Sequence, residues 1–292
     1  IQEVNQNLLD RNIYNQLEDA LKLHFGACVL VSSSTPIRSP TSWKPGGTIL
    51  AVLGTWSHTV TATSSDSLGR WCKATLSGRD GSLLSVYSLY NVVKTDISKV
   101  GPATIFAQQW QLLRLSGHEK PDPRQQCIDD LKIEVQKEQN IGSEIVIMGD
   151  LNEVVGDDPA LMASVCATCH LYDPFSDLYP DQADTPTYAR GRKRLDWVFV
   201  SRSLSPTIDA VGYNRYNLLY HSDHQAIFLD LAKRDSLGLS SLLIPHSRRP
   251  IHSNSPHVRD FVLETYKHLQ QNKVFHKFSD FNLNAATDDH PS

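Results

Sequence analysis

Several polar side chains in this sequence stand directly beside apolar runs that predict β-strands. Asp150 and Asn152 follow the run 145–148, with Gly149 between them and the run. The run is short, apolar and rich in β-branched residues, which predicts a strand buried on both faces. A carboxylate and an amide at the end of such a strand could provide acid–base and electrostatic chemistry. A turn is the alternative explanation, since Gly-Asp and Asn commonly form turns.

Three more polar clusters have similar positions. Gln2-Glu3 precedes an expected helix, Arg194-Leu195-Asp196 precedes the apolar run 197–200, and Ser222-Asp223-His224 precedes the run 226–229. Seen singly, each has a structural explanation: an acid at a helix start, an ion pair at a strand end, or an Asx-type turn. Only the whole set, in its order, points to a functional site.

The elements that would position these clusters are strands mixed with a few long helices. Strands are expected at 27–32, 48–53, 71–76, 83–93, 145–148, 195–200 and 226–231, and helices at 4–24, 103–115, 122–142 and 159–171. The helix start at 122 is well marked, because Asp122 suits the N-cap, Pro123 the first helical position and Gln125 the capping box. We expect an α/β (α+β) fold in which two packed mixed β-sheets, flanked by helices, form a four-layer sandwich.

The composition is that of an ordinary globular chain. Its 292 residues, 40% of them hydrophobic and 21% charged, suffice for one large α/β domain with appendages. The formal net charge of −4 argues against a protein that coats nucleic acid, but it leaves room for a nuclease with a metal and local basic loops. No apolar run approaches the roughly 20 residues that a membrane helix needs, so we expect no membrane partner.

Five cysteines are too few and too scattered for a disulfide framework. Cys166, Cys169 and His170 match the C-x-x-C-H pattern of covalent haem attachment, and a zinc half-site is another interpretation. The surrounding segment instead predicts a helix with apolar Leu161 and Val165. This favours small buried thiols in a reducing compartment.

The composition changes after Leu231. We expect a main domain at 1–232, a Ser-, Arg- and Pro-rich linker at 233–256, and a helical tail at 257–292 that leads towards a downstream domain. Six of the twelve histidines lie beyond Pro245, and their irregular spacing favours a solvated helix over a metal-binding tract. The chain starts without Met and without a signal-peptide pattern, so we expect a fragment of a longer protein.

Taken together and in this order, the clusters resemble the endonuclease/exonuclease/phosphatase superfamily, the DNase I-like proteins. The resemblance covers residues 1 to about 232 and rests on six short motifs: Gln2-Glu3, Gly46-Gly47, Tyr90, Gly149-Asp150-Leu151-Asn152, Leu195-Asp196 and Ser222-Asp223-His224. Within the superfamily, the chain is most similar to the endonuclease domain of non-LTR retrotransposon polyproteins. This narrower resemblance rests on Gln108-Gln109-Trp110, Asp122-Pro123-Arg124, Arg190-Gly191 ahead of Arg194, and the tail from Ser255.

The resemblance implies metal-dependent phosphodiester hydrolysis with Mg²⁺, or with Mn²⁺ in its place. Glu3 and Asp223 would bind the metal, which neutralises charge on the phosphate and leaving oxygens. Asp150 would be the general base, Asn152 would donate to a phosphate oxygen, and Tyr90 would contact the phosphate. Asp196 would pair with His224 and keep it protonated. The basic residues that would grip DNA are Arg190, Arg192, Lys193 and Arg194.

The function implied is a DNA endonuclease that nicks target DNA for a retroelement, with a reverse transcriptase domain downstream and a nuclear place of action. Two alternatives stay open: a phosphodiesterase or phosphatase acting on inositol or lipid headgroups, and a truncated retroelement remnant without activity. The family's first strand, with an Asn that helps to bind the metal, is expected upstream of Ile1. We therefore expect the chain alone to be poorly soluble or inactive.

Overall fold

The structure is a computed structural model that describes residues 1–39, 41–216, 222–232, 237 and 258–272. The chain divides into two compact units, Ile1–Leu243 and Ile244–Ser292. The first unit holds every strand described, and the second holds helix α7 (Val258–Gln271). No helix within the described ranges combines the length and apolarity that a membrane span requires. The expected linker at 233–256 lies outside the described residues, apart from Leu237.

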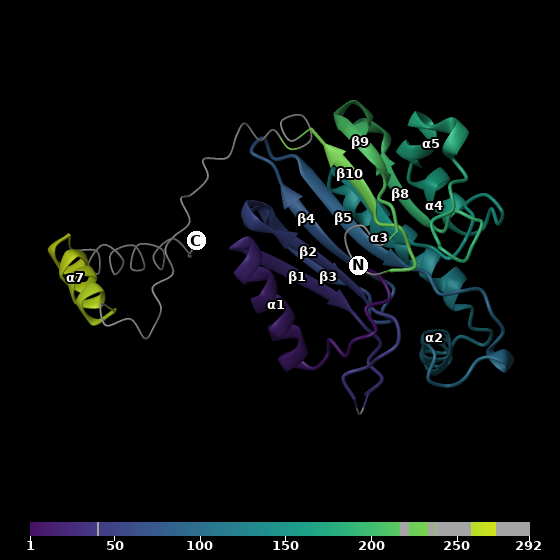
Figure 1. Ribbon diagram of the computed structural model, residues 1–292, viewed down its shortest axis with the longest axis horizontal. Coiled ribbons are helices and arrows are strands. Elements are labelled where there is room, and N and C mark those ends of the chain that lie inside the picture. Colours follow the sequence, from purple (N-terminus) through teal and green to yellow (C-terminus); the bar gives the residue numbers. More distant parts are fainter. Residues whose placement is uncertain (40, 217–221, 233–236, 238–257, 273–292) are drawn as a thin grey trace, which may run out of the picture. The chain divides into compact units, whose positions relative to one another are not determined.

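The first unit is organised around a six-stranded mixed sheet (Figure 1). Its strands, in spatial order, are β3 (Val60–Ser65), β4 (Trp71–Ser77), β5 (Leu83–Tyr90), β6 (Ser143–Asp150), β8 (Asp196–Ser201) and β7 (Leu171–Tyr172). β5 and β6 are parallel, and the other neighbours are antiparallel. The connection between the parallel pair contains helices α2 (Ile105–Leu115) and α3 (Pro123–Asn140), because a parallel crossover needs a long connection.

Two smaller antiparallel sheets lie against the large one. β1 (Cys28–Ser33) pairs with β2 (Thr48–Leu53), and β9 (Ile208–Tyr213) pairs with β10 (Ile227–Leu231). Their apolar side chains pack on one face of the large sheet in a cluster that includes Val52, Val146, Val198 and Val211. Figure 1 looks onto this face.

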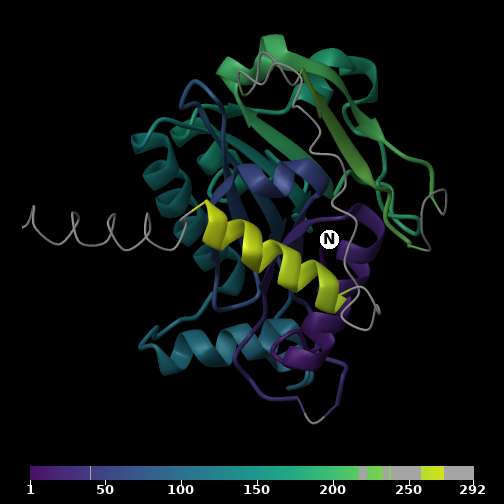
Figure 2. The same ribbon diagram turned by 90° about the vertical axis from the view of Figure 1, so that its left-hand side faces the viewer.

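Helices cover the outer faces. α3 and α4 (Met162–Thr168) pack on the other face of the large sheet through Ile128, Leu131 and Val165, while α1 (Arg11–Phe25) packs on β1 and β2 through Ile13 and Leu17. Figure 2 shows these layers from the side, with the teal helices on one side of the sheet and purple α1 and the green strands on the other. The expected four-layer sandwich is confirmed, with one difference: the second sheet consists of two separate strand pairs.

The central strand is buried on both faces, as its apolar run predicts. Ile145 and Ile147 of β6 pack under the helices, while Val146 faces the small sheets. Strands β3 and β9 were not predicted, since neither contains a continuous apolar run. Short helix α5 (Pro174–Leu178) follows β7.

Helix starts follow their capping residues. The helix expected at 4–24 begins only at Arg11, where Asp10 is the N-cap. α3 begins where predicted, and the carboxylate of Asp122 accepts from the backbone N of Arg124 and Gln125. The predicted capping box is wrong: among the described residues the backbone N of Asp122 makes no hydrogen bond to Oε1 of Gln125, whose Nε2 donates to Asp129.

The cysteines of the C-x-x-C-H pattern lie in and just after α4. All five cysteines are free. Burial raises the pKa of the Cys166 and Cys169 thiols, as expected for small, unreactive core residues.

Candidate active site

Three of the predicted site residues meet at one edge of the large sheet because of strand register. Tyr90 ends β5, Asp150 ends β6 and Asp196 begins β8. In the parallel β5–β6 ladder Tyr90 is opposite Asp150, and in the antiparallel β6–β8 ladder Asp150 is opposite Asp196. Residues that are far apart in the sequence therefore form one row at the strand ends.

Asp150 is 6% exposed, and its carboxylate is held by its own loop. Oδ1 accepts a hydrogen bond of 2.9 Å from the backbone N of Asn152, and Oδ2 accepts one of 3.1 Å from Nδ2 of the same residue. Desolvation, followed by the negative charge of Asp196, raises the pKa of Asp150 to about 7. Asp150 can therefore accept a proton near neutral pH, which suits a general base.

Asn152 is engaged within the protein. Besides its bond to Asp150, its Nδ2 donates 2.9 Å to the carbonyl oxygen of Asn91, so both amide hydrogens have acceptors. Its φ of 49° lies in the left-handed region, which Asn tolerates better than most residues. In this structure Asn152 orients Asp150, and the expected bond to a phosphate oxygen would require one of these contacts to open.

His224 and Asp196 form the pair that the resemblance implied. Nδ1 of His224 lies 2.8 Å from Oδ2 of Asp196. Burial alone lowers the pKa of His224, but the hydrogen bond and charge of Asp196 outweigh it and raise the pKa to about 9. His224 is therefore protonated at neutral pH and places a positive charge beside Asp150.

Tyr90 and Glu3 are joined by a hydrogen bond of 2.7 Å from the phenol to Oε1 of the carboxylate. Burial, followed by the charge of Glu3, raises the pKa of Tyr90, which therefore keeps its proton. Glu3 reaches this position because the first residues run along β2, with Gln2 opposite Thr48.

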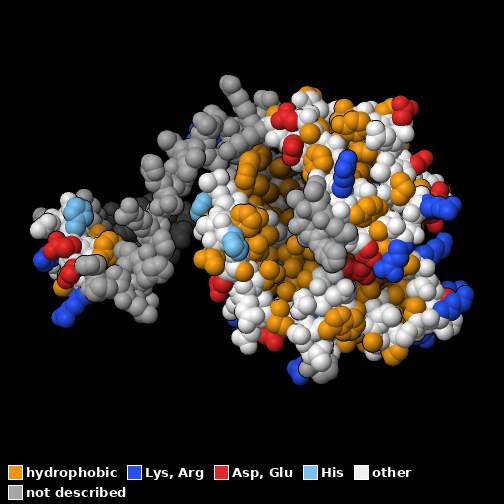
Figure 3. Space-filling view, in the orientation of Figure 1, with side chains coloured by type: hydrophobic (Ala, Val, Ile, Leu, Met, Phe, Trp, Pro, Cys, Tyr) orange, Lys and Arg blue, Asp and Glu red, His pale blue; other side chains and the backbone are white. Residues whose placement is uncertain are grey.

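Four of these side chains, Glu3, Asp150, Asp196 and His224, line one cavity of about 770 Å³. Its charged lining consists of Glu3, Asp150, Asp196, Asp223 and His224. Its apolar lining comes from both small sheets and from the large sheet, through Leu50, Val86, Met148 and Ile227. Figure 3 shows this face, with an orange hydrophobic hollow and red acidic side chains at its border.

The charged lining fits a hard divalent cation. Within the part of the chain that the structure describes, the ligand atoms of Asp150, Asp196 and His224 lie within 4.8 Å of one another. Glu3 and Asp223, the expected ligands, line the same cavity but are not members of that group. Nδ1 of His224 is already bonded to Asp196, and Mg²⁺ prefers oxygen donors. The carboxylates are therefore the better candidate ligands.

Three of the four basic residues expected to grip DNA are exposed: Arg190, Arg192 and Lys193. The guanidinium of Arg190 lies 3.3 Å from Asp223, and the ammonium of Lys193 lies 3.4 Å from Asp157. Exposed pairs of this kind are weak, so both cations can exchange their carboxylate for a phosphate.

The prediction that Arg194 grips DNA is wrong. It is 1% exposed, and its guanidinium donates to the carboxylate of Asp173 at 2.5 and 2.9 Å and to the hydroxyl of Tyr213 at 2.6 Å. The guanidinium also lies 4.0 Å from the ring centre of Trp197. Arg194 therefore ties α5 to β8 and β9 inside the protein, where it cannot contact a DNA strand.

Three buried residues beside the site were missed. Asn91, directly after Tyr90, is fully buried, and neither polar atom of its side chain has a hydrogen-bond partner among the described residues. Arg124 and Glu153 form a buried ion pair behind the Asp150 loop. Two signals for them are present in the sequence: Asn91 and Glu153 are each adjacent to a predicted site residue, and Arg124 belongs to the Asp122-Pro123-Arg124 motif.

Comparison with known proteins finds similar structures but no similar sequences. No family model matches the sequence, and no curated protein matches it. The 3'-5' exonuclease NExo from Neisseria meningitidis is 17% identical, with a TM-score of 0.51 over 79% of this chain and 87% of that chain. A second NExo structure, a 3' phosphatase bound to a product DNA hairpin, is 16% identical, with a TM-score of 0.50 over 79% of this chain and 86% of that chain.

Two further structures match. The AP endonuclease LMAP from Leishmania major is 14% identical, with a TM-score of 0.50 over 78% of this chain and 76% of that chain. The endonuclease domain of TRAS1, a telomere-specific non-LTR retrotransposon, is 15% identical, but its TM-score of 0.38, over 70% of this chain and 80% of that chain, is too low to support an argument. At such identities the likeness concerns the fold alone.

Proposed function

We propose that this chain, whose fold is that of the endonuclease/exonuclease/phosphatase superfamily, hydrolyses phosphodiester bonds in DNA with a divalent cation. The observation that carries the proposal is the arrangement of Asp150, Asp196 and His224, which we call the catalytic row. In this row a carboxylate with a pKa of about 7 lies beside an imidazolium with a pKa of about 9. A base that can deprotonate water next to a cation that can bind an anionic phosphate is the pairing that such hydrolysis needs.

Each residue of the site has its own role in the proposed reaction. Asp150 takes the proton of the attacking water at its carboxylate, which Asn152 holds in a fixed orientation. His224, kept cationic by Asp196 at its Nδ1, donates from Nε2–H to a non-bridging phosphate oxygen. Tyr90 holds the carboxylate of Glu3 in place.

Glu3 and Asp223 would hold Mg²⁺, or Mn²⁺, with water and phosphate oxygens completing its coordination. When bound, the cation neutralises charge on the phosphate and on the leaving oxygen. The support is the donor set of the cavity, in which both carboxylates lie together with Asp150 and Asp196.

DNA is the proposed substrate, gripped by Arg190, Arg192 and Lys193 at the rim of the site. Arg190 and the neighbouring Tyr188 adjoin the catalytic row, since Tyr188 is the bridge partner of His224. The narrower role, nicking of nuclear target DNA for a retroelement with a reverse transcriptase downstream, rests on the sequence motifs named above.

A strand upstream of Ile1 remains part of the proposal. The cavity is bordered by Leu50 of β2 and Ile227 of β10, with Val86 and Met148 of the large sheet between them. Apolar side chains of three sheets thus face a space in which an extended segment could pair with the small sheets.

The test is relaxation of a supercoiled plasmid by residues 1–292 and by the longer reading frame, each with Mg²⁺, with Mn²⁺ and with EDTA. Nicked circles should form with either metal and not with EDTA. If neither protein nicks with metal, the hydrolase proposal is overturned in favour of a non-catalytic remnant. Phosphate release from inositol or lipid headgroups without nicking would instead support the phosphatase alternative.

A further inference from the structure

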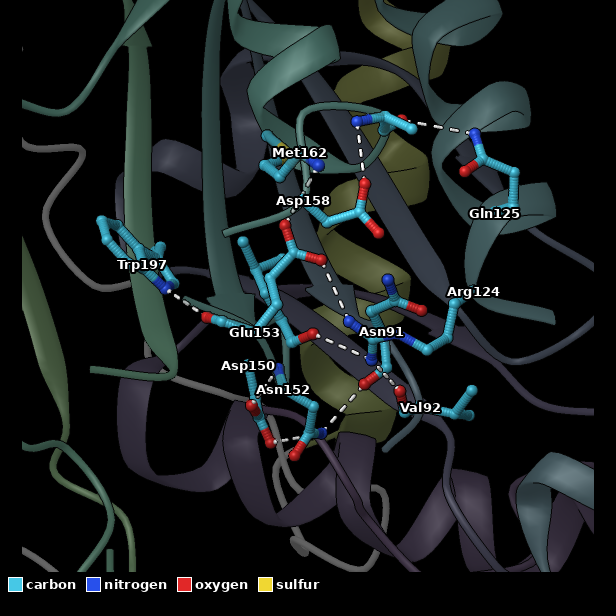
Figure 4. A network of polar contacts seen from close by, with 12 residues as sticks. Asn91, Val92, Arg124, Gln125, Asp150, Asn152, Glu153, Asp158, Met162 and Trp197 are labelled. Carbon is cyan, nitrogen blue, oxygen red and sulfur yellow. Dashed lines mark hydrogen bonds and ion pairs between the residues drawn. The ribbon is translucent and has the colours of Figure 1, made fainter. Parts of the chain in front are cut away.

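A buried ion pair lies directly behind the loop that carries Asp150 and Asn152 (Figure 4). Nη2 of Arg124, the third residue of the Asp122-Pro123-Arg124 motif, lies 3.0 Å from Oε2 of Glu153. The two side chains are only 6% and 8% exposed. Neither residue has a part in the chemistry proposed above.

Arg124 connects three segments. From the first turn of α3, its Nη1 donates to the carbonyl oxygen of Val92, just beyond β5. The same Nη1 lies 3.5 Å from the carbonyl oxygen of Leu151, between Asp150 and Asn152. The guanidinium therefore links the helix, the end of the Tyr90 strand and the Asp150 loop.

Glu153 fixes the other side of the loop. Its Oε1 accepts a 3.0 Å bond from the backbone N of Met162 at the start of α4. Its carbonyl oxygen accepts a 3.1 Å bond from Nε1 of Trp197, next to Asp196 in β8. The three oxygen atoms of Glu153 are thus bonded to three different elements, α3, α4 and β8, as Figure 4 shows.

Asn152 lies between these anchors in a left-handed conformation with a φ of 49°. Asn adopts this conformation more readily than most non-glycine residues, and the bonds on both sides of the loop hold it there. Because the backbone N and Nδ2 of Asn152 hold both carboxylate oxygens of Asp150, a relaxed loop would release the carboxylate of Asp150.

We propose that Arg124 and Glu153 are positioning residues, and that their ion pair sets the orientation of the Asp150 carboxylate through Leu151 and Asn152. The inference rests on the proposed function in one respect, the effect of the ion pair on the rate of DNA nicking. A purely structural ion pair is the alternative, and buried pairs can often be replaced by apolar residues of similar volume without loss of stability. The two roles therefore predict different results when both charges are removed together.

The experiment compares Glu153→Gln, Arg124→Lys and the double variant Arg124→Met/Glu153→Met. The matched control is Glu138→Gln, which also removes the charge of a buried glutamate, one that pairs with Lys73 at 2.5 Å near the far end of α3. We expect Glu153→Gln and Arg124→Lys to lower kcat for nicking by roughly 10–100-fold, the effect of a small misplacement of a catalytic group, with KM changed less than about twofold. The control should keep the parent kcat.

The double variant separates the two roles. If the ion pair positions Asp150, the double variant should have a parent-like Tm while its kcat stays low. If the ion pair is purely structural, both the Tm and the kcat of the double variant should return to the parent values. Full recovery of kcat in the double variant, or an equal loss of kcat in Glu138→Gln, would overturn the proposal.

Amide hydrogen exchange provides a readout that needs no activity. In Glu153→Gln and in the double variant, amides of residues 151–154 should exchange faster than in the parent, while Glu138→Gln should leave them unchanged. If the parent does not nick DNA, the proposed function fails, and exchange alone decides the positioning role. Unchanged exchange at 151–154 would refute it.

Discussion

Asp150 and Asp196 are register partners across the antiparallel β6–β8 pair, so two carboxylates stand side by side where β6 ends and β8 begins. Like charges in this arrangement repel each other and destabilise a sheet. Two features of the site offset the repulsion: Asp150 has a pKa of about 7, and Asp196 is bonded to the imidazole of His224. The fold thus tolerates a costly pair in the place where the proposed chemistry needs it.

The first prediction concerns the general base. Asp150→Asn keeps the shape of the side chain but removes the proton acceptor, so nicking should fall by roughly 10²–10⁴-fold. The plasmid-relaxation rate with Mg²⁺ measures the loss, and circular dichroism confirms folding. A folded variant that nicks as fast as the parent would exclude Asp150 from the mechanism.

The second prediction concerns stability and pH. The pKa of Asp150 is about 7 in the folded protein against an ordinary value of 3.8. Between these values the folded state binds a proton that the unfolded state lacks, so this carboxyl costs stability as pH rises from about 4 to about 7. Asp150→Asn removes that cost. Its Tm advantage over the parent, measured in EDTA, should grow across this window and level off above it, and a pH-independent difference would contradict the assignment.

The third prediction concerns the Asp196–His224 pair. Asp196→Asn and His224→Ala should each lower nicking strongly, yet the double variant should lose much less than the sum of the two single losses in activation free energy, because the residues act as one unit. Rates of all four proteins complete the cycle. Additive losses would show that the 2.8 Å contact has no part in catalysis.

The fourth prediction separates the basic residues. Substituting Arg190, Arg192 or Lys193 by Gln should weaken DNA binding uniformly across sequences and lower the salt slope of log Kd by about 1 each, with Tm unchanged. Arg194→Gln should instead destabilise the protein by about 3–5 kcal/mol, since it leaves the largely buried carboxylate of Asp173 without its cationic partner. Filter binding at several salt concentrations and thermal melting measure the two effects. A parent-like Tm for Arg194→Gln would contradict the buried role.

The fifth prediction concerns upstream residues. A longer reading frame that restores a few dozen residues before Ile1 should be more soluble than residues 1–292 and should nick faster with Mg²⁺. Sedimentation and plasmid relaxation, run on both proteins, compare them. If residues 1–292 alone are monomeric, fold cooperatively and are fully active, the proposal of a missing first strand is wrong.

The sequence predicted the parts of the fold whose signals are local. The β-branched run 145–148 is the buried centre of the large sheet, and Asp122 caps α3 as its residue type suggests. β3 escaped prediction because it is an edge strand with short polar side chains. The division of the second sheet into two pairs depends on contacts between distant strands, which no local pattern encodes.

The residues of the site likewise divide into those with a local signal in the sequence and those without one. Asp150 and Asp196 could be found because each adjoins a local apolar run, whereas Tyr90 was predicted only through the resemblance. Strand register then brings positions 90, 150 and 196 together in the structure. The burial of Arg194 could not be found, since its residue type matches that of its exposed neighbours and only Asp173 distinguishes it. The partnership of Arg124 with Glu153 joins a helix to a loop across 29 positions, and no spacing rule predicts it.

The distribution of the site along the chain has a consequence for synthesis. Glu3 bonds Tyr90 across 87 positions, and His224 bonds Asp196 across 28. A ribosome must therefore release nearly all of the first unit before the catalytic row can assemble. Nascent chains that stop short of His224 would carry the acidic residues without their cationic partner, so the hydrolytic activity proposed here would arise only after His224 has left the ribosome.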